Sequence, residues 1–188
     1  MYDTLFQHVK KFIPIHDGAL EIIARSFVLF EVQKKEIILN EEQLCTYIYF
    51  VSEGCLRLFY TDEKGTDQTI QFALETWWMT DIDAFHRSAK SSFCIQAVED
   101  SLLLGIKKSD WDTLLEGFPE MEKYFRQIYE RAYAAAIFRM KYLRLPKDEI
   151  YKTFISKYPE FVQRIPQKLL ASFLGFTPEY LSELRKKK

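Results

Sequence analysis

The sequence predicts an α+β fold in which an antiparallel, β-rich region comes first, one long helix follows and a helical region comes last. Residues 26–107 consist of short runs rich in Val, Ile, Tyr, Phe and Thr, which favour strands. A helical pattern then extends over about 25 residues. The final segment combines apolar residues at helical spacing with a surplus of basic ones. Apolar residues make up 48% of the chain, which is enough for packed cores.

Two short helices are expected before the β-rich region. Pro14 ends the first helix, and Asp17 is placed to cap the second. The apolar residues at helical spacing are Phe6, Val9, Phe12 and Ile13 in the first helix, and Leu20, Ile22 and Ile23 in the second.

The β-rich region contains five clear strand candidates. Asp62–Gly65 predicts a hairpin turn between two of them, because Gly65 can adopt a positive φ without steric cost. The spacing of the runs is that of a β-sandwich or barrel. The candidates are Tyr47–Val51, Cys55–Tyr60, Thr69–Phe72, Phe93–Ala97 and Leu102–Ile106.

A long helix should begin near Pro119 and end at Leu145–Pro146. Its apolar residues follow a 4-3 pattern, which Arg139 interrupts, and an alanine-rich stretch at 132–136 would let two copies approach closely. We therefore expect a homodimer, although an ordinary core helix remains the alternative. The residues expected at the dimer interface are Phe125, Ile128, Ala132 and Ala135.

The segment after Ile165 has the spacing of a helix-turn-helix. Gly175 supplies the turn, and Ala171, four residues earlier, supplies the small residue where the two helices cross. Thr177 can cap the second helix, and Pro178 suits its first turn. The residues expected to face the core of the motif are Leu170, Leu174, Phe176, Leu181 and Leu184.

Charge indicates that this end of the chain contacts a polyanion. Residues 139–188 carry 12 Lys and Arg against 5 Asp and Glu, a net +7, whereas the remainder, with 14 basic and 22 acidic residues, is −8. We expect double-stranded DNA as the partner; a helical hairpin that binds nothing is the alternative. The candidate DNA-binding residues are Gln167, Lys168, Thr177, Glu179, Tyr180, Ser182, Arg185, Lys186 and Lys187.

Three segments resemble the Crp/Fnr superfamily, in particular its short, wing-poor members common in Bacteroidetes. Ile48–Arg57 resembles the strand-turn-strand of that family, with Gly54 at the turn, and Asp62–Gly65 resembles the hairpin that follows. Leu170–Ser182 resembles its DNA-reading head. The resemblance implies a jelly-roll barrel of the cyclic nucleotide-binding type at 1–117, a dimerisation helix at 118–144 and a helix-turn-helix domain at 145–188. It also implies a transcription regulator, not an enzyme, with a small-molecule effector and with RNA polymerase as a candidate partner.

The effector pocket that the resemblance implies consists of Thr80 and Asp81, where relatives that bind cyclic AMP have a Gly-Glu pair, and of Ser91 and Ser92, where they have an Arg-Ser pair. An arginine that grips the cyclic phosphate is therefore missing, and neighbouring Lys90 should point to the opposite face. We do not expect cyclic AMP to bind, and the effector is unknown.

Other cofactors and a membrane location are not expected. The family's iron-sulfur members have an N-terminal cysteine cluster, whereas the first cysteine here is Cys45, and the three histidines lack metal-ligand spacing. Cys45, Cys55 and Cys94 are expected to be core thiols. No stretch approaches the roughly 18–20 apolar residues of a membrane span, and the N-terminus is too polar for a signal peptide, so we expect a cytoplasmic protein.

Two features of the reading head differ from the family pattern. Glu183 stands where many relatives have an arginine, and the sequence ends at Lys188, so no β-wing is expected. These differences leave open a second hypothesis, a small-molecule or protein-binding module that has lost specific DNA binding. A cupin-like enzyme is disfavoured because no cluster of His and Glu ligands is visible.

Overall fold

The computed structural model describes residues 2–186, which form two units. The first unit contains the chain up to Tyr60 together with Gln71–Tyr129. The second contains Thr61–Ile70 and the chain from Glu130 onward. The tip of one β-hairpin therefore belongs to the same unit as the C-terminal helices.

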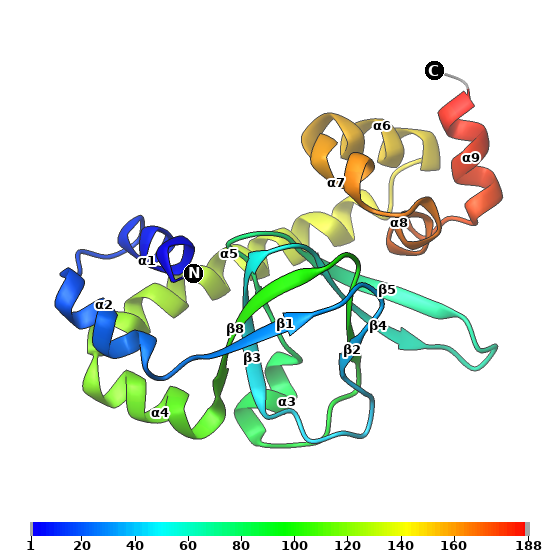
Figure 1. Ribbon diagram of the computed structural model, residues 1–188. Coiled ribbons are helices and arrows are strands. Elements are labelled where there is room, and N and C mark those ends of the chain that lie inside the picture. The colour runs from blue at the N-terminus through cyan, green and yellow to red at the C-terminus, as the bar shows by residue number, and fades with distance from the viewer. Residues whose placement is uncertain (1, 187–188) are drawn as a thin grey trace. The chain divides into compact units, whose positions relative to one another are not determined.

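The β-strands form two antiparallel four-stranded sheets (Figure 1). One has the order β1-β8-β3-β6 and the other the order β2-β7-β4-β5, so strands distant in sequence are neighbours, as in a jelly roll. The expected α+β fold with an antiparallel barrel is confirmed. The strands are β1 (Val28–Val32), β2 (Ile37–Leu39), β3 (Tyr47–Glu53), β4 (Leu56–Thr61), β5 (Asp67–Ala73), β6 (Trp78–Met79), β7 (Cys94–Ala97) and β8 (Ser101–Lys107).

Gly54 joins β3 to β4 in a conformation that other residues rarely adopt, with φ +98°. A Cβ atom at this position would lie 2.3 Å from Ser101 Oγ and 2.7 Å from the carbonyl oxygen of Asp100. Both conformation and space therefore require glycine at the predicted turn. The predicted Asp62–Gly65 turn is also confirmed: Gly65 has φ +74°, and the Asp62 carboxylate accepts hydrogen bonds from the backbone N–H groups of Lys64 and Thr66.

Four helices and the start of a fifth belong to the first unit. α1 (Asp3–Lys10), α2 (Asp17–Ala24) and the long α5 (Pro119–Tyr142) confirm predicted helices, whereas α3 (Ile82–Arg87) and α4 (Lys108–Gly117) were not predicted. The cap expected at Asp17 is wrong in detail. His16 is the N-cap, because its Nδ1 accepts a hydrogen bond from Ala19 N, and Asp17 occupies the first turn.

An aromatic cluster fixes the start of α5 within the first unit. The ring centroids of Phe125 and Trp111 lie 3.9 Å apart, and Trp78 donates a hydrogen bond from Nε1 to the Tyr124 hydroxyl over 2.9 Å. Phe125 is only 2% exposed. It was expected at the dimer interface, but its own protomer already covers it, so that assignment is wrong.

The second unit consists of helices, of which α5 and α8 (Gln167–Leu174) contact residues 67–70 of the hairpin. After the C-terminal part of α5 come α6 (Lys147–Lys157), α7 (Pro159–Arg164), α8 and α9 (Pro178–Lys186). Phe154 organises their packing, since its ring lies 5.7 Å from Phe161 and 5.8 Å from Phe173. None of the helices in residues 2–186 is long and apolar enough to cross a membrane.

Candidate nucleic-acid interface and effector cassette

The turn between α8 and α9 has the local geometry that a helix-turn-helix requires. Gly175 ends α8 in the left-handed conformation, with φ 73° and ψ 32°. Its N–H donates to Ser172 O, and the N–H of Phe176 donates to Ala171 O over 2.8 Å. Ala171 is fully buried. The roles predicted for the glycine and the alanine are confirmed.

The start of α9 is held by a cap and by a link to α8. Thr177 Oγ1 accepts a hydrogen bond of 3.2 Å from the N–H of Tyr180, which confirms the predicted cap. The side chain of Gln167 donates from Nε2 to Pro178 O over 3.3 Å. Gln167, predicted to contact DNA, is therefore also placed to set the angle between the two helices.

The side chains of α9 divide into a buried and an exposed face. Leu181 is fully buried and Leu184 is half-buried, so the face predicted for the core does face it. Tyr180 is half-buried, with its ring 5.5 Å from that of Phe176. Ser182 is also half-buried. The exposed candidates for DNA binding are Lys168, Thr177, Glu179, Arg185 and Lys186, and Lys187 lies outside the described residues.

The cassette of the barrel, residues 80–92, brings the predicted effector residues together but fills the site with its own carboxylate. Asp81 is 6% exposed and caps α3: its Oδ1 accepts from Ala84 N over 3.2 Å. Its Oδ2 accepts from Ser91 Oγ over 3.1 Å and from Ser92 N over 3.0 Å. These donors would otherwise be available to an anionic ligand. The cassette therefore already contains a negative charge bound by hydrogen bonds.

The remaining cassette contacts are also internal. The Thr80 hydroxyl donates to Tyr47 O over 2.9 Å and lies 3.2 Å from the sulfur of Cys45. Burial raises the pKa of the Cys45 thiol, as expected for a core thiol. Lys90 Nζ lies 3.4 Å from Glu42 Oε2 at the surface. Its ammonium group is thus engaged outside the cassette, in agreement with the orientation predicted for it.

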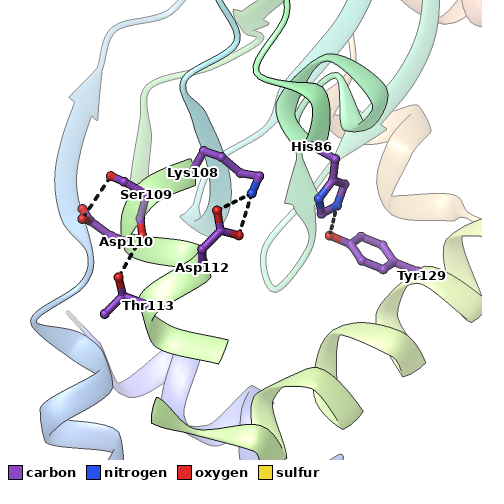
Figure 2. A network of polar contacts seen from close by, with 7 residues as sticks. All are labelled: His86, Lys108, Ser109, Asp110, Asp112, Thr113 and Tyr129. Carbon is purple, nitrogen blue, oxygen red and sulfur yellow. Dashed lines mark hydrogen bonds and ion pairs between the residues drawn. The ribbon is translucent and has the colours of Figure 1, made fainter. Parts of the chain in front are cut away.

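Like His16, the N-cap of α2, the other two histidines contact protein groups. His8 Nδ1 lies 2.8 Å from the Tyr124 hydroxyl, and His86 Nε2 lies 3.2 Å from the Tyr129 hydroxyl, beside the ion pair of Lys108 and Asp112 (Figure 2). Burial lowers the pKa of His86. Within residues 2–186, no group of three His, Cys, Asp or Glu side chains is arranged to hold a metal ion.

The sequence analysis did not identify two polar residues of the second unit, Ser172 and Arg139. Ser172 Oγ accepts a hydrogen bond from Thr69 N and donates one to Asp67 O, each over 2.9 Å. Arg139 donates to backbone carbonyls of both the hairpin tip and α8. The only signal in the sequence was that Arg139 interrupts the apolar pattern of its helix.

Comparison with known proteins relates the barrel to a known domain family and shows the fold of the chain. The model of the cyclic nucleotide-binding domain family matches residues 29–118. FixK2 from Bradyrhizobium japonicum is 18% identical with a TM-score of 0.73, over 86% of this chain and 83% of that chain. The Thermus thermophilus catabolite activator protein is also 18% identical, with a TM-score of 0.60 over 94% and 84% of the two chains.

A third solved structure, the c-di-GMP responsive global regulator CLP from Xanthomonas campestris, is 11% identical, with a TM-score of 0.71 over 92% of this chain and 91% of that chain. No curated protein matches by sequence. Residues 29–118 therefore match the cyclic nucleotide-binding domain family, and the chain as a whole has the fold of FixK2 and of the other two regulators.

Proposed function

We propose that this protein is a dimeric, DNA-binding transcription regulator of the Crp/Fnr type. The observation that carries the proposal is the geometry of α8, Gly175 and α9. A left-handed glycine, a buried alanine and a threonine cap meet at one turn, and the helix that follows ends in the exposed basic residues Arg185 and Lys186. In such a motif the second helix reads base edges in the major groove, while surrounding cations contact phosphates.

The exposed face of α5 supports a dimer. From Arg131 to Phe138 every residue is exposed, including the four alanines of the predicted close approach. Five large apolar side chains between residues 133 and 143 are also exposed, and Tyr133 has an exposed fraction of 70%. An apolar stripe of this kind on a soluble chain marks an association surface. The stripe consists of Tyr133, Ile137, Phe138, Met140 and Leu143.

The interface proposed here therefore begins later than the sequence suggested. Phe125 is excluded because its own protomer buries it, and Ile128 is half-buried. Ala132 and Ala135 remain at the proposed interface, next to the large apolar side chains. A twofold dimer would place two reading heads on half-sites about 34 Å apart.

The barrel is proposed to sense something other than cyclic AMP. A bound cyclic phosphate would meet the Asp81 carboxylate in a buried site that contains no arginine, and like charges at short range are unfavourable. Calorimetry with cyclic AMP should show no specific heat of binding. A dissociation constant in the low micromolar range would show that another cation replaces the arginine.

DNA binding can be tested by selection of genomic fragments followed by binding titrations at several salt concentrations. Replacing Lys186 and Lys187 by Ala should weaken binding to all sequences and flatten the salt dependence by about one unit per lost phosphate contact. Tyr180→Ala should change sequence preference instead, and Glu183→Arg should tighten binding. Lys34→Ala, an exposed substitution in the first unit, is the matched control and should change nothing.

One observation favours a second function, a binding module without specific DNA binding. Glu179 and Glu183 are both exposed and lie one turn apart on α9, where they would repel phosphates. If the selection enriches no fragment, or if removing residues 178–188 leaves DNA affinity unchanged, this second function replaces the first.

A further inference from the structure

The outer edge of β5 is unusual because side chains of the C-terminal helices satisfy its backbone. β5 is the last strand of its sheet, so one row of its N–H and C=O groups has no partner strand. Ser172 supplies an acceptor for Thr69 N and a donor for Asp67 O. One hydroxyl thus replaces the two hydrogen bonds that a neighbouring strand would make.

Arg139 contributes the second half of this contact. Its Nη1 donates to Ile70 O, and its Nη2 lies 3.5 Å from Thr69 O and 2.9 Å from Phe173 O. The guanidinium also lies over the Phe173 ring, 4.2 Å from the centroid. Arg139 is half-buried, and burial lowers the pKa of its guanidinium.

The contact that Arg139 of α5 makes with α8 has a second physical consequence. Phe173 lies in the last turn of α8, where carbonyl groups lack helical partners and the helix dipole is negative. Two neighbouring carbonyls are satisfied by the turn, since Ala171 O and Ser172 O accept from Phe176 and Gly175. Arg139 satisfies the next carbonyl, that of Phe173. The end of the first helix of the motif is therefore tied to α5 and to the hairpin tip at once.

The contact contains several hydrogen bonds, but two of its buried polar atoms make none with the part of the chain that the structure describes. The Nε atom of Arg139 and the hydroxyl of Thr69 are buried without a hydrogen-bond partner among residues 2–186. Buried polar groups without partners are costly, so part of the gain from the other hydrogen bonds is lost.

We propose that Arg139 and Ser172 are positioning residues for DNA reading: they hold the reading head, α8 and α9, at a fixed orientation by fastening α8 to the outer edge of β5. The inference rests on the proposed DNA-binding function and deepens it. α5 carries the proposed dimer interface, and α8 leads directly into the helix proposed to read DNA. A head held in place can match only one spacing of half-sites, whereas a loosened head can match several.

The test uses the full-length protein, with Ser172→Ala and Arg139→Lys as separate variants. Ser172→Ala removes both hydrogen bonds to β5, and Arg139→Lys keeps the charge but loses the planar fork that reaches three carbonyls. Arg144→Lys, an exposed arginine close in sequence, is the control for the second variant. Arg139→Ala is avoided because loss of a buried cation could prevent folding.

The first readout is affinity for the selected site and for the same site with two additional base pairs between its halves. Each variant should weaken binding to the correct site about five- to tenfold, as expected for one or two lost hydrogen bonds. Binding to the lengthened site should weaken less, so that the penalty for wrong spacing falls at least about threefold. Non-specific binding and its salt slope should stay unchanged, because no phosphate contact is removed.

The second readout is amide hydrogen exchange, which needs no DNA. Exchange should accelerate in residues 61–73 and in α8 of both variants, and not in the Arg144→Lys control. If the native protein binds no DNA, the proposed function fails, and exchange alone decides whether the contact exists in solution. An unchanged spacing penalty in a protein that does bind DNA, or unchanged exchange at the hairpin, overturns the positioning role.

Discussion

Replacing Asp81 tests whether its carboxylate is an integral part of the barrel. In Asp81→Ala, the cap of α3 is lost, and the backbone N–H of Ser92, an exposed residue, loses its charged acceptor. Ser91 Oγ is less affected, because it already contacts both the N–H and the carbonyl of Phe93. The lost cap costs about 1 kcal/mol. The lost hydrogen bond from Ser92 N to a charged group, about 1.5 kcal/mol for a donor that water can reach, brings the loss of unfolding free energy to about 2–3 kcal/mol.

Asp81→Asn should have a smaller effect. The amide oxygen can still cap α3, and Ser91 can accept a hydrogen bond from the amide nitrogen, so Ser92 N is the main group left unsatisfied. We expect a loss of about 0.5–1.5 kcal/mol for this one hydrogen bond, because Ser92 is exposed and water can replace the acceptor. Asp83→Ala is the matched control: Asp83 lies on the same helix, and its ion pair with Arg87 is exposed, so the change should be near zero.

Urea unfolding followed by tryptophan fluorescence measures these differences, since Trp77, Trp78 and Trp111 all lie in the first unit. The loss of unfolding free energy should be largest for Asp81→Ala, smaller for Asp81→Asn and smallest for the control Asp83→Ala. A loss below about 1 kcal/mol for Asp81→Ala would refute the argument, because the three donors would then not depend on the carboxylate. The cassette would in that case be open to an external anion.

Three further predictions concern the turn, the dimer and pH. Gly54→Ala should destabilise the barrel by about 3 kcal/mol or more in urea unfolding, because the new Cβ would overlap backbone atoms. Gly65→Ala, which has a positive φ but open space, should cost only about 1–2 kcal/mol. Ile137→Glu should convert the dimer to monomer in sedimentation at micromolar concentration; a native protein that is already monomeric contradicts the dimer. Because the pKa of His86 is lowered in the folded state, its contribution to stability is complete above about pH 6.5 and is lost as the pH falls through the lowered value. His86→Gln should flatten that part of the pH profile, and an unchanged profile contradicts the burial argument.

Local sequence signals predicted the parts of this protein that depend on local conformation. Gly65, Gly175 and Thr177 each lie where a turn or a cap requires that residue type, and the structure places them there. The long helix was visible because its apolar spacing is regular. β6 and α3 were not predicted, since two and six residues are too few to show a period.

Long-range contacts explain what the sequence could not reveal. Phe125 fits the 4-3 pattern as well as Ala132 does, and only the packing of Trp111 shows that it faces its own barrel. Ser172 and Asp67 are 105 residues apart, and no sequence pattern within either segment indicates that they form a hydrogen bond. Asp81 and Ser91 were placed together by family resemblance, but the closure of the cassette by its own carboxylate became apparent only in the structure.

The hydroxyl of Ser172 also bears on how this protein avoids self-association. The N–H of Thr69 and the carbonyl of Asp67 form a short template that any extended peptide could join by strand addition. While the serine occupies them, the hairpin cannot recruit a strand from a neighbouring chain. A variant that lacks this hydroxyl should therefore show a greater tendency to form β-linked aggregates at high concentration, even where its barrel is as stable as that of the native protein.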